Sequence, residues 1–405
     1  MTFVTSPYRT VLRTPGALRF AVSGFVGRVP MAMMTIAILL VVRHRTGSYG
    51  LGGAASAAHT LTQAAMTPLV GRLVDRFGQS AVMPRLLAVF LSGIGILTVA
   101  AATHAPVPVL FAGAVVAGAG QLPYPSLVRS RWTHLLAHSS ELSTALALES
   151  AADEAIFIIG PVVVTGLSAW NPLVAPLLAG GLALAGTAVF VGARSSEPPP
   201  FAAESGSGAW RIPAMWVLIA SSVLIGLVFG NVEVAVIAFA QRRGASGMAG
   251  LLLGIIALGS MAAGLWYGAR QWRLDIAVRY RLSLATLAAG SLPAVAAMTL
   301  WQLAPAALLI GVSIAPTLIA SSGLVARVVP ASSRTEGFTW QSTGINVGVA
   351  AGAALGGLLI DAFSVRVAFV VGPVAAALSA LVALTGGKLL AERPLVCAAS
   401  PTKAA

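Results

Sequence analysis

The chain has 405 residues, of which 57% are hydrophobic and only 9% are charged, and its mean hydropathy is +0.89. So little charge cannot coat a soluble globule of this length, which excludes an ordinary soluble domain and indicates an integral membrane protein. The net charge of +13 lies mostly in short breaks between apolar runs. There it is typical of topology control in a membrane and not of a surface that binds nucleic acid.

Twelve apolar stretches of membrane-spanning length follow one another along the chain. They are continuous and not alternating, which predicts helices instead of barrel strands. The first is longer than a signal-peptide core and is interrupted by Arg28 and Pro30, so we expect a retained helix. The predicted spans are 17–42, 51–70, 81–102, 106–128, 144–169, 172–193, 212–240, 249–268, 281–300, 303–325, 338–360 and 366–386.

Basic residues are divided unevenly between the two ends of these spans. If the N-terminus is cytoplasmic, nineteen Lys and Arg residues lie on that side and five on the other, with Arg28 inside the membrane. The positive-inside rule then predicts that both termini are cytoplasmic. The preference for Arg over Lys, together with heavy use of Ala and Gly, is typical of a GC-rich bacterial gene. We therefore expect a multi-pass protein of the bacterial plasma (inner) membrane.

One long polar break, rich in Pro, Ser and Gly, divides the chain into two parts that echo each other. A shift of 192 positions, from Gly160 to Gly352, also sets Glu154 over Asn346. Two related halves joined by a flexible linker are typical of transporters whose substrate site lies between the halves near mid-membrane. We expect a six-helix bundle over 1–193, a cytoplasmic linker over 194–211, a second six-helix bundle over 212–386 and a cytoplasmic tail over 387–405.

A charged segment separates the second span from the third. Its residues Gly71, Leu73, Asp75, Arg76 and Gly78 occupy the positions of the signature loop of the major facilitator superfamily, which the chain therefore resembles. The resemblance implies an all-α membrane fold in which two pseudo-symmetric six-helix bundles surround a central cavity. It also implies alternating access, with the glycines forming a tight turn and the charged pair forming part of a cytoplasmic gate.

The same resemblance gives Asp75 a specific role. The carboxylate would stabilise the outward-open state by meeting the N-terminal end of the eleventh helix, where the helix dipole is positive. An arginine such as Arg129 or Arg131 would lie beside it. In this way the loop would determine which side of the membrane the central site faces.

Glycines in the fifth and eleventh spans form a second pattern. Gly160 and Pro161 partly match a fifth-helix pattern of antiporters in this family, and Gly352 and Gly356 have small-residue spacing in the eleventh span. Such glycines let helices approach closely. Two interpretations stay open, namely simple close packing and a hinge specific to antiporters. The family's fourth-helix arginine is absent, because Ala114 stands at its position.

Five charged residues fall inside the predicted spans: Arg28, Glu149, Asp153, Glu154 and Glu233. Each costs about 3 kcal/mol at mid-bilayer unless it has a partner, water or a proton. First and fifth helices are neighbours in the family fold, so we expect Arg28 to pair with Asp153 or Glu154. Glu149 and Glu233 are then the candidates for carrying a coupling proton. The alternative is a structural ion-pair network that fixes the helix register.

Further polar and aromatic side chains are candidates for lining the cavity. For Trp340 a place in the aromatic belt of the membrane interface is the simpler alternative, and for His59 it is a structural hydrogen bond. The candidates are His59, Gln63, Gln121, Tyr124, Trp340, Gln341 and Asn346.

The motifs that the sequence lacks narrow its function. No phosphate-binding P-loop, HExxH motif, metal-ligand cluster or nucleophile elbow is present, so we expect neither an enzyme nor an ATP-driven pump, and no cofactor or metal. The sequence favours proton-coupled efflux of a drug-like compound or small metabolite, with the lipid bilayer, the substrate and protons as partners. A sugar or small-metabolite symporter or uniporter, and a non-transporting membrane sensor, are the alternatives.

Overall fold

The computed structural model describes the chain except for residues 1, 138, 201–207, 246 and 392–405. The described residues are largely helical and contain no strand, which confirms an all-α fold. Residues 201–207 of the expected linker lie outside the described residues. So do residues 392–405 of the expected tail, which include Cys397.

The helices follow one another in two groups, with short 3-10 turns at Arg194–Ser196, Ala209–Arg211 and Ala331–Ser333. The first group is α1 (Thr2–Arg13), α2 (Ala17–Thr46), α3 (Tyr49–Phe77), α4 (Gln79–Ala102), α5 (Val107–Gly120), α6 (Tyr124–Leu135), α7 (Leu142–Trp170) and α8 (Val174–Gly192). The second group is α9 (Pro213–Gln241), α10 (Gly247–Ala269), α11 (Ile276–Ala296), α12 (Leu300–Val328), α13 (Arg334–Ala362), α14 (Val365–Thr385) and α15 (Gly387–Ala391).

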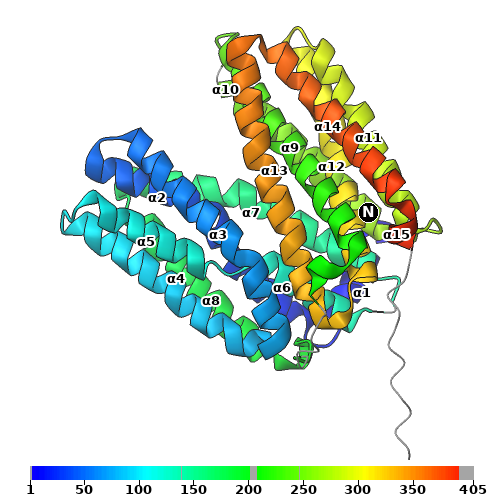
Figure 1. Ribbon diagram of the computed structural model, residues 1–405, viewed down its shortest axis with the longest axis horizontal. Helices are drawn as coiled ribbons and strands as arrows, with labels where there is room; N and C mark the ends of the chain where they lie inside the picture. The colour runs from blue at the N-terminus through cyan, green and yellow to red at the C-terminus, as the bar shows by residue number, and fades with distance from the viewer. Residues whose placement is uncertain (1, 138, 201–207, 246, 392–405) are drawn as a thin grey trace, which may run out of the picture.

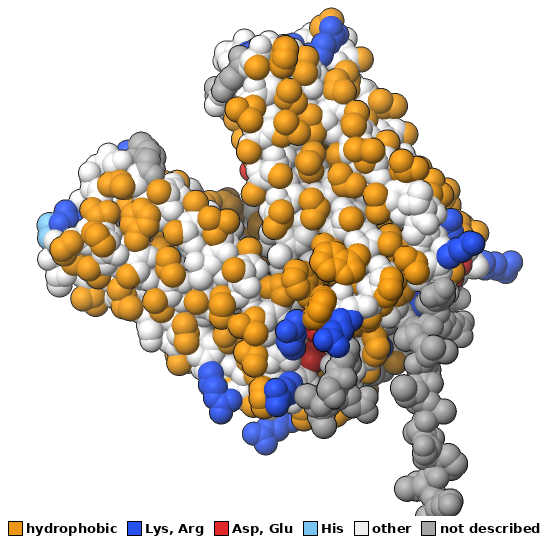
Figure 2. All heavy atoms as spheres, viewed as in Figure 1, with side chains coloured by type: hydrophobic (Ala, Val, Ile, Leu, Met, Phe, Trp, Pro, Cys, Tyr) orange, Lys and Arg blue, Asp and Glu red, His pale blue; other side chains and the backbone are white. Residues whose placement is uncertain are grey.

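The two groups form two bundles that diverge like the arms of a V (Figure 1). They meet where α3 and α6 pack against α13, and where α7 packs against α10 and α12. We call the end that holds the α3–α4 turn and the start of α13 the closed end, and the opposite end the open end. Figure 2 shows a cleft between the bundles at the open end and Lys and Arg side chains gathered at the closed end.

Ten helical segments of the described chain are long and apolar enough to cross a membrane. Each predicted span overlaps a helix, but α3 and α11 fall outside these ten. The reason lies in their composition, since α3 contains His59 and Gln63 and α11 contains Arg279 and Arg281. Polar residues at these positions lower the hydropathy of a helix whose length would suffice.

The predicted fourth span, 106–128, is not one continuous helix. It breaks at Gln121, which is extended (φ −60°, ψ 123°), and resumes as α6 after Pro123. Pro123 has no N–H to donate and disfavours helical backbone in the residue before it, so the helix ends here. A second consequence is that α6 continues to Leu135 and carries Arg129, which the sequence placed in a loop, into the protein interior.

The segment that the sequence predicts as a turn over 71–78 is helical up to Phe77, so this expectation is wrong for all but its last residue. Only Gly78 leaves the helix, with φ +84°, a conformation that a side chain would strain. Gly71 instead lies in the helix and lets α3 approach Thr339 and Glu336 of α13. The helix α1 was not predicted either.

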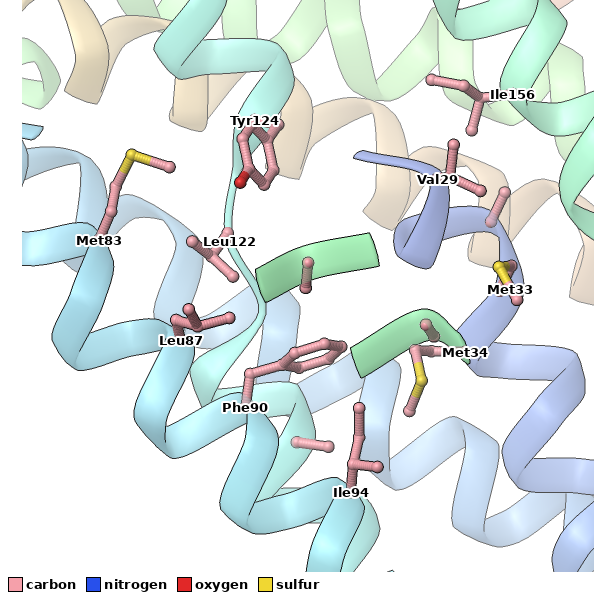
Figure 3. Packing of buried hydrophobic residues seen from close by; sticks show 14 of the residues in the cluster. Val29, Met33, Met34, Met83, Leu87, Phe90, Ile94, Leu122, Tyr124 and Ile156 are labelled. Carbon is pink, nitrogen blue, oxygen red and sulfur yellow. The ribbon is translucent and has the colours of Figure 1, made fainter. Parts of the chain in front are cut away.

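Close helix packing in the first bundle depends on small residues and one apolar cluster. Gly93 of α4 packs against Ala117, and Gly120 packs against the backbone of Phe90. Figure 3 shows side chains of this cluster, among them Phe90 and Met34, converging between the helices. Interiors packed this densely deform little, so the bundle is suited to move as one body.

Candidate functional site

An ion-pair network joins α2, α6 and α7 inside the first bundle. The guanidinium of Arg28, only 1% exposed, pairs with Glu149 and donates to Asp153 Oδ1 at 2.8 Å. Asp153 Oδ2 accepts from Arg129 at 2.7 Å, and Glu149 Oε1 accepts from the indole N–H of Trp132 at 2.8 Å. Two guanidinium groups therefore face two carboxylates, and the network is neutral as a whole.

This network settles two expectations about pairing. Arg28 pairs with Asp153, one of its two expected partners, whereas Glu154 is not among its contacts. Glu149 is not a left-over carboxylate, because both of its oxygens are engaged. The sequence missed Arg129, since the predicted end of the fourth span left it in a loop. It also missed Trp132, which is fully buried.

The remaining two carboxylates have no cationic partner among the described residues. Glu154 accepts a hydrogen bond of 2.7 Å from the Ser260 hydroxyl, so the contact links α7 of the first bundle to α10 of the second. Glu233 on α9 is exposed and has neither a hydrogen bond nor an ion pair within the described chain. It lies two turns after Gly226, on the face of α9 that packs against α13 and away from the exposed Trp216.

A second cluster closes the other end of the cleft. The carboxylate of Asp75 accepts backbone hydrogen bonds from Thr335 (3.1 Å) and Glu336 (2.8 Å), where α13 begins. Thr335 also donates to Ser130 of α6 at 3.0 Å. Since free N–H groups and the positive end of the dipole gather at a helix start, a carboxylate is stabilised there. We call Asp75, Ser130, Thr335 and Glu336 the gate.

Glu336 holds the gate together from the second bundle. It is 1% exposed and accepts from Arg72 (2.9 Å), from the indole of Trp340 (3.3 Å) and from the backbone N–H of Ala209 (3.1 Å). The sequence missed this residue. The available signal was an acid just before the eleventh predicted span, but its partners lie far away in the chain.

The arginines expected beside Asp75 are elsewhere. Arg129 belongs to the ion-pair network, and Arg131 binds Gln79 (2.6 Å) and the Ala193 carbonyl (2.8 Å). The arginine that interacts electrostatically with Asp75 is Arg334. The expectation failed because α6 extends past its predicted end and turns these two side chains inward. Arg76 is exposed, and its guanidinium lies over the ring of Phe77, 5.0 Å from the ring centroid.

Outside the spans, the loop between α10 and α11 carries one acid, Asp275. Burial alone would raise its pKa, but the Ala277 N–H and the Arg327 guanidinium, at 2.6 Å, outweigh burial and hold the pKa below its usual value. This pair lies within the second bundle. It therefore has no part in joining the two bundles.

The residues proposed to line the cavity separate into three groups. His59 is 2% exposed and hydrogen-bonds the Ala114 carbonyl at 3.1 Å, and Gln341 binds Ser321 at 2.8 Å. These are interior hydrogen bonds, as is the 2.8 Å bond from Tyr124 to Thr187, and buried Gln121 lies at the helix break. Trp340 donates to Glu336 of the gate. Asn346 is exposed and Gln63 is partly exposed, which leaves these two accessible to a solute.

The glycines singled out in the fifth and eleventh spans lie at helix contacts. Gly160 meets Ala32 of α2, and Gly352 meets the Leu227 carbonyl of α9. Gly356 lies against the amide of Asn231, while Pro161 is partly exposed. In the described residues, no three His, Cys, Asp or Glu side chains come together as metal ligands would.

Substitution of Asp75 by asparagine is expected to weaken the gate. Asparagine replaces one of the two accepting oxygens by an NH2 group, which cannot accept a hydrogen bond. One backbone hydrogen bond worth about 0.5–1.5 kcal/mol is therefore lost, and the population of molecules whose open end has closed should rise. Spin labels on Thr103→Cys and Trp301→Cys, in a Cys397→Ser background, should report shorter distances across the open end. Arg76→Gln is the control from the same motif. An unchanged distance distribution in Asp75→Asn contradicts the prediction.

Known proteins share this arrangement of helices. A family model described as the Major Facilitator Superfamily matches residues 20–293 and 277–395. A search of curated proteins found no match. Among solved structures, a bacterial homologue of the iron transporter ferroportin in an outward-facing state aligns with a TM-score of 0.77 and 16% identity, over 92% of this chain and 99% of that one.

Two other solved structures are similar. The human organic anion transporter MFSD10 (TETRAN) aligns with a TM-score of 0.68 and 16% identity, over 91% of this chain and 99% of that one. The transporter FucP in its outward conformation aligns with a TM-score of 0.67 and 14% identity, over 93% of this chain and 99% of that one. At such identities the likeness shows a shared fold.

Proposed function

The chain belongs to the major facilitator superfamily of membrane transporters, and we propose that it exports a drug-like compound or small metabolite in exchange for protons. The family is one of transporters and not of enzymes. On this proposal the two bundles rock about the cleft by alternating access. On the same proposal the arginine-rich closed end lies in the cytoplasm, as the positive-inside rule predicts, so the open end faces outward from a bacterial plasma membrane.

The observation that carries proton coupling is the charge balance of the interior. Arg28 and Arg129 neutralise Glu149 and Asp153, whereas partly exposed Glu154 and exposed Glu233 have no cationic partner among the described residues. A carboxylate in a membrane interior needs a proton, water or a cationic solute. A proton and a cationic or polar cargo would compete for the same two groups. Competition of this kind produces exchange, and so it favours export over symport.

Glu154 has a further property that suits a coupling residue. Its hydrogen bond to Ser260 spans the two bundles, so the bond must change when the bundles move. A ligand shifts a conformational equilibrium only if it binds the two states differently. Protonation of a carboxylate whose partner changes with the state meets that condition, whereas the closed network around Arg28 stays within one bundle.

Glu154→Gln and Glu233→Gln are expected to abolish exchange while leaving the fold intact. Proteoliposomes with an imposed pH gradient, loaded with ethidium as an organic cation, should show at least a tenfold loss of gradient-driven flux in either variant. Glu141→Gln, at the start of α7, is the matched control. Full flux in both Gln variants would exclude these residues as couplers.

A neutral sugar tested in the same vesicles separates the alternatives. Accumulation of radiolabelled glucose driven by protons would support a symporter, and glucose flux without protons would support a uniporter. A folded protein that transports neither ethidium nor glucose under any gradient would favour a non-transporting membrane sensor.

A further inference from the structure

A groove of about 720 Å³ runs along the outside of the first bundle, between α2 and α8, and reaches the α1–α2 connection at the closed end. Its walls are apolar and face outward, with Leu18 57% exposed, Val22 54% and Val189 46%. Its floor is low because Gly186 of α8 packs directly on Gly27 of α2. The volume lies in the range of about 300–1,000 Å³ that holds a small ligand.

Two arginines stand at the closed end of this groove. Arg13 ends α1, and Arg19 lies in the first turn of α2, where its guanidinium passes beside Gly192 of α8. Both are exposed, and neither forms an ion pair with a carboxylate in the part of the chain that the structure describes. Positive charge at one end of an apolar trough thus has no carboxylate counter-ion among the described residues.

We propose that this groove binds an anionic phospholipid, with its phosphate between Arg13 and Arg19 and an acyl chain along Leu18, Val22 and Val189. The two parts of the groove match the two parts of such a lipid in chemistry and in order. Guanidinium groups bind phosphate through charge-assisted hydrogen bonds, and basic pockets beside membrane helices attract anionic headgroups. A zwitterionic lipid carries its own cation beside the phosphate, so it balances the charge of the two arginines less well than an anionic lipid does.

The groove lies against the connection between α1 and α2. The wall formed by Arg13 and Gly16 is the hinge from which α1 crosses to the second bundle, where Tyr8 donates to the Leu265 carbonyl of α10 at 2.6 Å. Gly16 has φ +81°, so this hinge adopts a conformation that most residues avoid. A headgroup bound at this hinge therefore fixes the point from which α1 extends to the second bundle.

Native mass spectrometry of the full-length protein in detergent tests the proposal with phosphatidylglycerol and phosphatidylcholine as probes. The unmodified protein should bind phosphatidylglycerol at least tenfold more tightly. Arg13→Gln/Arg19→Gln should remove this preference and leave phosphatidylcholine binding unchanged. Ala185→Trp, which fills the groove, should weaken both lipids at least tenfold. Arg85→Gln, an exposed arginine at the same end, is the matched control and should bind as the unmodified protein does.

Three results would overturn the proposal. The first is a lipid preference that survives Arg13→Gln/Arg19→Gln. The second is an equal loss in Arg85→Gln, which would show diffuse charge attraction. The third is displacement of phosphatidylglycerol by an equal concentration of glycerol 1-phosphate, which would show a site for free phosphate. If Ala185→Trp does not fold, Val22→Trp fills the groove from the opposite wall and takes its place.

Discussion

Replacing Arg28 by methionine is expected to lower the free energy of unfolding by about 3–5 kcal/mol, because it leaves a buried carboxylate without its counter-ion. Glu149 would keep only the Trp132 indole as a partner, while Asp153 would keep Arg129. Methionine is long and apolar and fills much of the same space, so the loss measures charge more than volume. The thermal midpoint in detergent should fall, and less protein should elute as a monodisperse peak.

A second substitution separates charge balance from packing. Arg28→Met/Glu149→Gln removes the orphaned charge and keeps the bond to Trp132, so we expect it to recover a large part of the lost stability. Arg85→Met, at an exposed position, should change stability by less than about 0.5 kcal/mol. If the double variant is as unstable as Arg28→Met, charge balance is not what makes the network necessary.

Gly352→Ala is expected to destabilise the second bundle by about 1–3 kcal/mol, the usual cost of forcing atoms into a packed interface. A methyl group there would fall well inside van der Waals contact with the Leu227 carbonyl of α9. The backbone carbonyl cannot move aside as a flexible side chain would. Gly226 and Gly348 meet opposing carbonyls in the same way, so α9 and α13 have no slack to take up the change.

The control for this substitution lies on the same helix. Gly357→Ala adds a methyl group where no atom lies within 4 Å, and alanine also favours helix, so no loss of stability is expected. Thermal midpoints of the two variants in one detergent give the comparison. A stable Gly352→Ala protein that has lost exchange would instead favour the antiporter hinge over simple packing.

The sequence predicted the helical spans well because apolar runs of sufficient length have one stable form in a bilayer. It failed where the backbone responds to local geometry. Pro123 splits a predicted span, and α3 continues through the charged segment up to Gly78. The short helix α1 is amphipathic and contains Pro7, so apolar length could not reveal it.

The candidate site was predictable in composition but not in pairing. A charge inside a membrane demands a partner, which pointed to Arg28 and the acids of α7. Which acid it meets depends on how α7 is rotated against α2, and Asp153 and Glu154 differ by about 100° around the helix. Glu336 was missed for another reason, because its partner Arg72 is close to it only after the two bundles have met.

Asp153 and Glu154 are consecutive residues of α7, but they bind partners in different bundles. Asp153 forms ion pairs with two arginines of its own bundle, and Glu154 accepts a hydrogen bond from Ser260 of the second bundle. Separating the bundles at this point breaks a single hydroxyl contact and leaves the buried charges undisturbed. At this contact the bundles can therefore separate with the network around Arg28 still paired, and the electrostatic cost of the separation there falls on the carboxylate of Glu154.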